Sequence, residues 1–372
     1  MIRISKHQLF CLIILFEIGS TTLFALGIDA KQDAWIAILF AMLCGLVLLC
    51  IYTELQKHFP GKNFAEIIIT LLGKVLGGPL VLLYALYFIY VSTRNLRDFG
   101  ELIVTTFLPG TPQIVVLIIF MLTVFYILFL GFEVLSRTSE IMLPVVLLFI
   151  IGAYVMISIS GQVNLRELTP VLASGLKPVL NTAFPLVVTF PFGEMVVFLM
   201  YWCYADSKQA IRRTSFLAVG ISGLLLIVSV IIIISVLGVN YASTATIPFL
   251  EVVKLINIGD ILTNLDAIGI MVIFIGGLFK MTLFFYGGVL ALTTLFKIKD
   301  KRWMILPAGI FTIWLSIVFE PNYPYHVWLG LKLTTKYIHI PFQIIMPILL
   351  LIIGWLKKKT NKDSQKSYLL GW

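Results

Sequence analysis

Long apolar runs constrain this chain more than any other feature of its sequence. A helix needs ~20 consecutive apolar residues to cross the hydrocarbon of a bilayer, and ten segments approach that length. Only 12% of the residues are charged and 60% are hydrophobic, whereas a soluble domain carries about a quarter charged residues. We therefore expect an all-α membrane protein with spans near 8–27, 33–55, 79–103, 112–132, 140–158, 182–203, 214–238, 264–290, 303–320 and 340–356.

The distribution of lysine and arginine predicts the orientation of these spans. With the N-terminus inside, about two thirds of the 27 basic residues fall in inner segments, so both termini are expected in the cytoplasm. The net charge of +9 then reflects topology and attraction to membrane lipid. Nucleic acid is not an expected partner, because the charge is divided among short loops. Residues 1–356 are expected to form one bundle, and residues 357–372 a basic cytoplasmic tail.

Two of the expected spans are interrupted, and each interruption lies beside a glutamate. The first interruption follows Glu17, where Gly19 precedes three hydroxyl side chains. The second lies in the run Phe190–Pro191–Phe192–Gly193, immediately before Glu194. Unpaired peptide groups and carboxylates are costly in lipid, so matched interruptions indicate a binding site near the midplane.

The interruptions also relate the two halves of the chain. A shift that superimposes Glu17 on Glu194 brings the second and third spans near the seventh and eighth, although later spans register less well. Five spans per half is an odd number, so consecutive halves enter the membrane from opposite sides. We expect a five-plus-five inverted repeat, about 7–158 and 182–356, with helices 1 and 6 broken.

The first interruption offers hydrogen-bond donors to a solute. Gly19 permits unusual backbone angles, and the hydroxyls of Ser20, Thr21 and Thr22 can satisfy freed backbone groups or bind a solute. The N–H groups of the helix that restarts near Thr22 suit a carboxylate.

The second interruption offers acceptors. Pro185 and Pro191 lack N–H groups, and carbonyls near Pro191 are free to accept from an ammonium or from hydroxyls. A zwitterion such as an amino acid suits the two interruptions together, and so does a sugar. The alternative is that both kinks are only structural, since proline and glycine are common in membrane helices.

Charged residues inside the spans form a candidate proton or charge network. Glu17 and Glu194 can bind a proton, a solute amine or hydroxyls, or can act as static hydrogen-bonded contacts. Lys280 lies mid-span and needs a carboxylate partner, for which Glu194 or Glu17 is expected. Arg94 and Asp98 are four residues apart on the third span and share a helix face, which favours a local ion pair near an outer vestibule.

Other chemistry finds little support in the sequence. It contains no P-loop and neither H-E-x-x-H nor G-x-S-x-G, so we expect no enzymatic activity and no cofactor. The cysteines are expected to be buried hydrophobes rather than disulfides or zinc ligands, and the histidines to be interfacial. These residues are Cys11, Cys44, Cys50, Cys203, His7, His58, His326 and His339. Residues 57–78 predict an amphipathic inner helix and a turn, and residues 321–339 an outer connection.

At the two interruptions the chain resembles the spore germination permease-like family. These proteins are the B subunits of bacterial nutrient germinant receptors, within the amino acid–polyamine–organocation superfamily. The segments that carry the resemblance are Glu17-Ile18-Gly19-Ser20-Thr21-Thr22-Leu23-Phe24 and Phe190-Pro191-Phe192-Gly193-Glu194. The length of the chain and the ten-span plan also fit.

The resemblance implies a leucine-transporter-like fold in which helices 1, 3, 6 and 8 surround the solute. It implies that the segment from Gly19 to Thr22 faces a solute carboxylate, and that the segment from Phe190 to Gly193 contacts the solute beside Glu194. It further implies an integral protein of the spore inner membrane that senses an amino acid or sugar. Its implied partners are an A-type membrane subunit and a C-type lipoprotein subunit. The alternative with the same site is a proton-coupled amino acid transporter.

Overall fold

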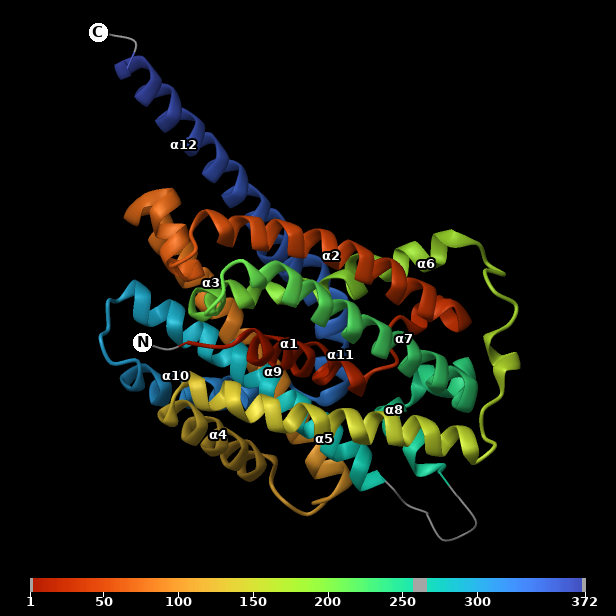
Figure 1. The fold of residues 1–372 in the computed structure, drawn as a ribbon. Coiled ribbons are helices and arrows are strands. Elements are labelled where there is room, and N and C mark those ends of the chain that lie inside the picture. The colour runs from red at the N-terminus through yellow and green to blue at the C-terminus, as the bar shows by residue number, and fades with distance from the viewer. Residues whose placement is uncertain (1–2, 257–265, 370–372) are drawn as a thin grey trace.

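The computed structural model describes residues 3–256 and 266–369, and the described part is a bundle of helices (Figure 1). Its eight helical segments long and apolar enough to cross a bilayer are Ile28–His58, Phe64–Thr106, Gln113–Leu130, Phe132–Ile159, Leu176–Met200, Ala210–Thr244, Gly269–Leu295 and Tyr323–Lys358. Two shorter apolar helices lie where the first and ninth spans were expected, at Lys6–Ile18 and Arg302–Val318.

The helices are α1 (Lys6–Ile18), α2 (Ala34–His58), α3 (Phe64–Thr106), α4 (Gln113–Leu130), α5 (Phe132–Ile159), α6 (Leu176–Thr182), α7 (Ala210–Thr244), α8 (Pro248–Lys254), α9 (Asp266–Leu295), α10 (Arg302–Val318), α11 (Tyr323–Trp328) and α12 (Met346–Leu369). The 3₁₀ segments are η1 (Ser20–Leu23), η2 (Ile28–Asp33), η3 (Leu165–Leu168), η5 (Phe192–Met200) and η6 (Trp202–Tyr204). The π-helical segments are η4 (Ala183–Val187) and η7 (Leu329–Ile345).

Helix α1 lies in the middle of the bundle, where it packs against α5, α7 and α9 (Figure 1). A capping box starts it, because Ser5 Oγ accepts from the Gln8 N–H while the Gln8 side chain accepts from the Ser5 N–H. Nearly all its residues from Leu9 onward are buried, including Glu17. Such an all-round burial suits a helix that is apolar on all sides.

Helix α3 contains the expected amphipathic helix, a sharp bend and the expected third span. Asn63 and Glu66 form its capping box, so it starts within the expected amphipathic segment 57–78. The expected turn lies at Gly73, where φ and ψ of 74° and −178° divide α3 into two helices six residues before Pro79. Only Gly73 departs from helical geometry, with φ of 74°.

The prediction that residues 321–339 form an outer connection is wrong. Residues 323–345 are helical, as α11 and then η7, and they lead directly into α12. Polar residues lower the hydropathy of this segment, so its sequence predicts a loop. Lys332 and Lys336 line a cavity of ≈380 Å³, and Lys332 also lies 2.6 Å from the carboxylate of Asp29, so polar surroundings receive both lysines. Helix α12 then continues to Leu369 through most of the expected tail 357–372, of which residues 370–372 lie outside the described part.

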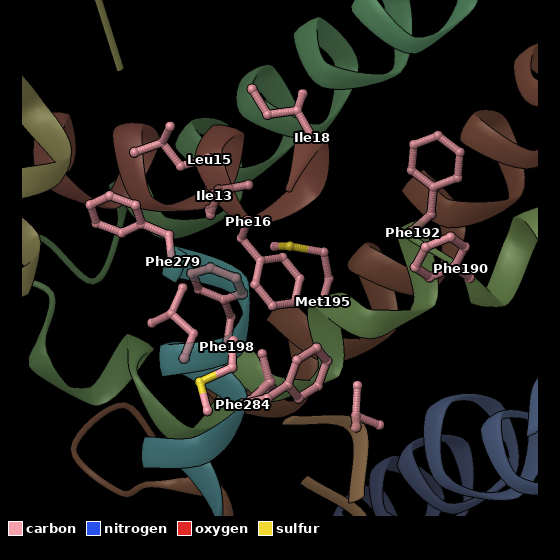
Figure 2. Close-up of a cluster of buried hydrophobic side chains, with 14 of the residues drawn as sticks. Ile13, Leu15, Phe16, Ile18, Phe190, Phe192, Met195, Phe198, Phe279 and Phe284 are labelled. Atoms are coloured by element: carbon pink, nitrogen blue, oxygen red, sulfur yellow. The ribbon is translucent and has the colours of Figure 1, made fainter. Parts of the chain in front are cut away.

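An aromatic cluster holds α1 against η5 and α9 (Figure 2). The Phe16 ring lies 5.1 Å from Phe198 in an edge-to-face arrangement and 5.2 Å from Phe284. Beside this cluster the backbones of α1 and α9 meet at two glycines. A Cβ on Gly19 would lie 2.8 Å from the carbonyl oxygen of Gly276, so neither position has room for a side chain.

Replacing Gly19 with alanine is therefore expected to destabilise the protein by about 1–3 kcal/mol through overpacking. Thermal unfolding in detergent measures this effect. Gly220 of α7 is the matched control, since no atom lies within 4 Å of its added Cβ and alanine favours a helix. Equal stability of Gly19→Ala and Gly220→Ala would contradict the close contact between α1 and α9.

Candidate functional site

The first interruption separates α1 from η1. Helix α1 ends at Ile18, and Gly19 has φ of −35° and ψ of −108°, outside helical geometry. Two hydroxyls satisfy the freed carbonyls, since Thr21 Oγ1 donates to the Glu17 oxygen at 2.7 Å and Thr22 Oγ1 donates to the Gly19 oxygen at 3.0 Å. This local exchange of backbone partners allows an interruption inside a nonpolar bundle.

The second interruption lies between α6 and η5. Phe184 has non-helical φ and ψ of −117° and 130°, and a short helical stretch then leads to the turn at Phe190 and Pro191. Side chains again supply donors to the free carbonyls. Thr189 Oγ1 donates to the Pro185 oxygen at 2.9 Å, and the hydroxyl of Tyr52 in α2 donates to the Gly193 oxygen at 3.3 Å.

Lys280 of α9 lies between the two interruptions. Its Nζ is 2.6 Å from Glu194 Oε2, and both side chains are almost completely buried, at 0% and 2% exposure. The ammonium also lies 4.5 Å from the centre of the Phe190 ring, 5.3 Å from that of Phe16, and 3.5 Å from Thr21 Oγ1. A carboxylate and two aromatic faces thus replace the water that a lysine normally requires.

Glu17 lies near this ion pair but has a different environment. Both its carboxylate oxygens are buried, and no group in the described residues forms a hydrogen bond with either. Lys280 already compensates one buried negative charge, that of Glu194. Glu17 therefore adds a second acidic group that requires a proton, water or an added cation to be stable in this environment.

A small cavity of ≈40 Å³ adjoins the Lys280–Glu194 pair. It is lined by groups from both interruptions, from α3 and from the last span. These residues are Ser20, Phe24, Val91, Arg94, Asn95, Asp98, Phe190, Glu194, Val327, Gly330, Leu331, Thr335 and His339. Among the described residues none donates to Asn95 Oδ1, which is buried, so this oxygen is a free acceptor in the wall of the cavity.

The residues expected to bind a solute occupy several different environments. Ser20, Phe190 and Glu194 line the cavity. Thr21 and Thr22 line a separate space of ≈10 Å³ beside α7, and Gly19 contacts Gly276. On the second interruption, Phe192 packs against Gly45, Gly193 lies against the side chain of Gln343, and the Pro191 oxygen accepts from the Glu194 N–H.

The expected local pairing of Arg94 with Asp98 is wrong. Arg94 Nη1 lies 2.5 Å from Glu320 Oε1, and its Nη2 donates to the His326 oxygen at 2.7 Å. Asp98 Oδ1 instead lies 2.9 Å from His326 Nε2 and accepts from the Tyr323 hydroxyl at 3.2 Å. Partners from the segment that follows α10 give each charge more than one hydrogen bond, which a neighbour four residues away on the same helix does not.

His326 links both carboxylates of this cluster. Its Nε2 contacts Asp98 and its Nδ1 contacts Glu320. A neutral imidazole has only one N–H, whereas two ionised carboxylates can only accept. With both carboxylates ionised, His326 is an imidazolium that joins α3 to the segment between α10 and η7. The expectation of interfacial histidines is thus wrong for His326, and for His339, which is buried and accepts or donates a 2.9 Å hydrogen bond with Tyr87.

Sequence reasoning missed three further participants in the site, Glu320, His339 and Gln343. The signal that was available was the regular spacing of Tyr84, Tyr87 and Tyr90 on α3. All three hydroxyls contact the last span, at the Phe342 oxygen, His339 Nδ1 and Thr334 Oγ1 respectively, at 2.7–2.9 Å. They do not line the cavity, and they instead fix the helix that carries His339.

Comparison with known proteins identifies relatives along nearly the whole chain. Residues 3–324 match the family described as "Spore germination protein". Spore germination protein KB of Bacillus subtilis (strain 168) is 36% identical over 98% of this chain and 97% of its own length. Spore germination protein XB of Bacillus anthracis is 22% identical over 89% of this chain and 91% of its own length.

Solved structures of transporters share the fold. MhsT in complex with L-phenylalanine has a TM-score of 0.67 at 13% sequence identity, over 95% of this chain and 99% of its own. Mhp1 is a nucleobase-cation-symport-1 family transporter, in a closed conformation with bromovinylhydantoin bound. It has a TM-score of 0.66 at 12% identity, over 95% of this chain and 90% of its own. Both neighbours have the leucine-transporter-like fold.

Proposed function

This chain belongs to the spore germination protein family, and from that premise we propose that it is the nutrient-sensing B subunit of a germinant receptor. In this proposal the solute binds in the cavity beside the Lys280–Glu194 pair, and its binding triggers germination. The observation that carries the proposal is that polar groups from both interruptions line one small cavity inside an apolar bundle. Buried polar groups around a cavity are costly unless a ligand or water satisfies them.

The lining of the cavity favours an amino acid or a sugar as the solute. Arg94 and Asp98 supply both signs of charge on the α3 side, and Glu194 supplies an acceptor on the opposite side. The free Asn95 oxygen can accept from an ammonium or a hydroxyl. Since each full charge already has a partner of opposite sign, a zwitterion or a polyhydroxylated solute suits this lining better than a net ion does.

Binding requires the cavity to widen. A space of ≈40 Å³ admits only a few water molecules, since a cavity needs about 10–15 Å³ to hold one. Phe24 and Phe190 both line the cavity, and their rings lie 6.1 Å apart in an edge-to-face contact. We propose that the solute separates these two rings. Phe190 also covers the ammonium of Lys280, so its movement would alter the buried ion pair.

The finer points of architecture and assembly follow from the same premise. We propose ten spans in a five-plus-five inverted repeat, with α1 and the short α10 as the two spans beyond the eight long ones. We further propose that the protein lies in the spore inner membrane with cytoplasmic termini, and that it acts with an A-type membrane subunit and a C-type lipoprotein. The role is that of a receptor or permease and not of an enzyme.

Replacing Glu194 with glutamine tests the solute site. We expect the concentration of nutrient that gives a half-maximal germination response to rise by about tenfold or more, since hydrogen bonds to charged groups contribute about 1.5–3 kcal/mol. Germination of spores against a series of amino acids and sugars measures this. Glu133→Gln is the control, because Glu133 forms an exposed pair with Arg137. An unchanged dose response in Glu194→Gln, with normal protein levels, would exclude Glu194 from the site.

The transporter fold is also compatible with a second function, that of a proton-coupled amino acid permease. The observation that favours it is Glu17, an acidic group without a hydrogen-bond partner in the described residues, beside a compensated ion pair. Uptake of radiolabelled solute into proteoliposomes with an imposed proton gradient separates the two functions. Net uptake that collapses with the gradient would establish transport, and binding without uptake would support the receptor.

A further inference from the structure

A second polar cavity lies at the end of the bundle that carries the N-terminus. Its volume is ≈790 Å³, within the range of ligand-binding clefts. The N-terminal segment, the start of α3, the turn after η6 and the α9–α10 turn meet at this end (Figure 1). It is separate from the solute cavity and shares no lining residue with it. We name it the basic cavity, after the four cations in its wall, Arg3, Lys208, Lys297 and Lys301.

Among the described residues none of these four cations forms an ion pair within 4 Å. Lys208 donates to the carbonyl oxygens of Trp202 and Cys203, and Lys301 donates to the Tyr204 hydroxyl at 3.1 Å. Two carboxylates, Glu66 and Asp206, also line the cavity, and Glu66 is engaged with the Asn63 N–H. The lining thus carries a net charge of about +2, counted from standard ionisation at pH 7.

Burial distinguishes two of these lysines from basic residues that only set topology. A lysine whose role is to set the orientation of the spans extends into water and stays hydrated. Lys208 and Lys301 are instead partly buried, and desolvation lowers the pKa of each ammonium below its usual range. Partly dehydrated cations that share one cavity attract an anion more strongly than fully hydrated ones do, because less water must be displaced on binding.

We propose that the basic cavity binds a phosphate-bearing anion. Lysines are effective point charges for phosphate, and the hydroxyls of Thr293 and Thr294 lie in the same lining as hydrogen-bond donors. The ligand is the headgroup of an anionic phospholipid or a soluble phosphate, and the two share this recognition chemistry. Basic pockets between spans on the cytoplasmic side of membrane proteins commonly hold anionic headgroups.

The cavity is joined to the first interrupted helix through the N-terminal segment. The Ile4 N–H donates to the Tyr204 oxygen at 3.0 Å, and the Asp206 N–H donates to the Ile4 oxygen at 2.9 Å. This pairing places Arg3 at the cavity and α1 directly after it. A bound anion therefore holds the N-terminal segment, the turn after η6 and the α9–α10 turn together, and we expect it to stabilise the whole fold.

Thermal unfolding of the full-length protein in a neutral detergent tests the proposal. We expect either soluble dihexanoyl-phosphatidylglycerol or inorganic phosphate to raise the unfolding temperature saturably, while zwitterionic dihexanoyl-phosphatidylcholine does not. A response to the lipid alone identifies a headgroup, and a response to phosphate alone identifies a soluble ligand. The double variant Lys208→Gln/Lys301→Gln should need about thirtyfold more of the effective anion, since each basic residue contributes about 1 kcal/mol, which is about fivefold in affinity.

Arg213→Gln/Lys299→Gln is the matched control, because both residues are basic and exposed and neither lines the cavity. It should respond as the unmodified protein does. Lys301→Arg keeps the charge, so it should also retain the response and thereby separates lost charge from lost folding. The absence of stabilisation by either anion, or an equal loss in the lining and control variants, would overturn the proposal.

Discussion

Replacing Lys280 with methionine is expected to lower the free energy of unfolding by about 3–5 kcal/mol and to abolish the response to solute. The variant removes the ammonium that lies 2.6 Å from Glu194 and leaves that carboxylate buried with no counter-charge. It also removes the cation from the face of Phe190, a ring that lines the solute cavity. Membrane insertion, purified yield, thermal unfolding and the germination response measure the separate effects.

A second substitution separates the stability of the pair from its function. Lys280→Met/Glu194→Gln removes both charges, so most of the lost stability should return, because a neutral buried pair no longer requires desolvation of ions. The response to solute should remain absent. Lys254→Met is the control, since Lys254 pairs with Glu251 at 2.8 Å on an exposed surface and such pairs contribute about 1 kcal/mol or less. A Lys280→Met protein that folds and responds normally would refute the role of the pair.

Local chemistry made the two interruptions predictable from sequence. Glycine, proline and clustered hydroxyls change backbone geometry wherever they occur in an apolar run, so Gly19 and Pro191 could be assigned without knowledge of the fold. The pairing of Lys280 with Glu194 was predictable for a similar reason. A lysine in the middle of a span needs a carboxylate, and few carboxylates lie at that depth.

The cluster around Arg94 was not predictable, because its partners come from segments more than two hundred residues away. Helical spacing offered Asp98 as the local partner of Arg94, but Glu320 competes for the same guanidinium and binds it instead. Nothing in the sequence ranks those alternatives, since the choice depends on how α3 packs against the end of α10.

The last span was misjudged for a physical reason that also concerns the site. Lys332, Lys336 and His339 break the apolar run, and hydropathy then predicts a loop. In the structure the two lysines line the cavity of ≈380 Å³, and His339 lines the solute cavity. The last span therefore carries polar residues where it faces cavities. The helix that hydropathy failed to predict therefore forms part of the candidate site.

Replacing His326 with alanine is expected to destabilise the protein by about 3 kcal/mol, through the loss of two charge-assisted hydrogen bonds in a buried cluster. The His326→Ala variant removes the cation that contacts both Asp98 and Glu320. Among the described ion pairs of this cluster, only that of Arg94 with Glu320 remains. Asp98 lines the solute cavity, so the variant should also weaken the solute response. His7→Ala is the control, because His7 forms the same kind of pair with Glu140 but is 67% exposed.

The sign of the pH effect follows from the number of protons in the cluster. The folded protein holds both imidazole protons of His326 between two carboxylates, so the stabilising contribution is present at low pH and is lost as rising pH removes one proton. The difference in unfolding temperature between the unmodified protein and His326→Ala should therefore shrink as pH rises. The double variant Asp98→Asn/His326→Ala should recover part of the loss at neutral pH, since it removes one uncompensated carboxylate. A difference that is independent of pH would show that His326 stabilises the fold only by packing.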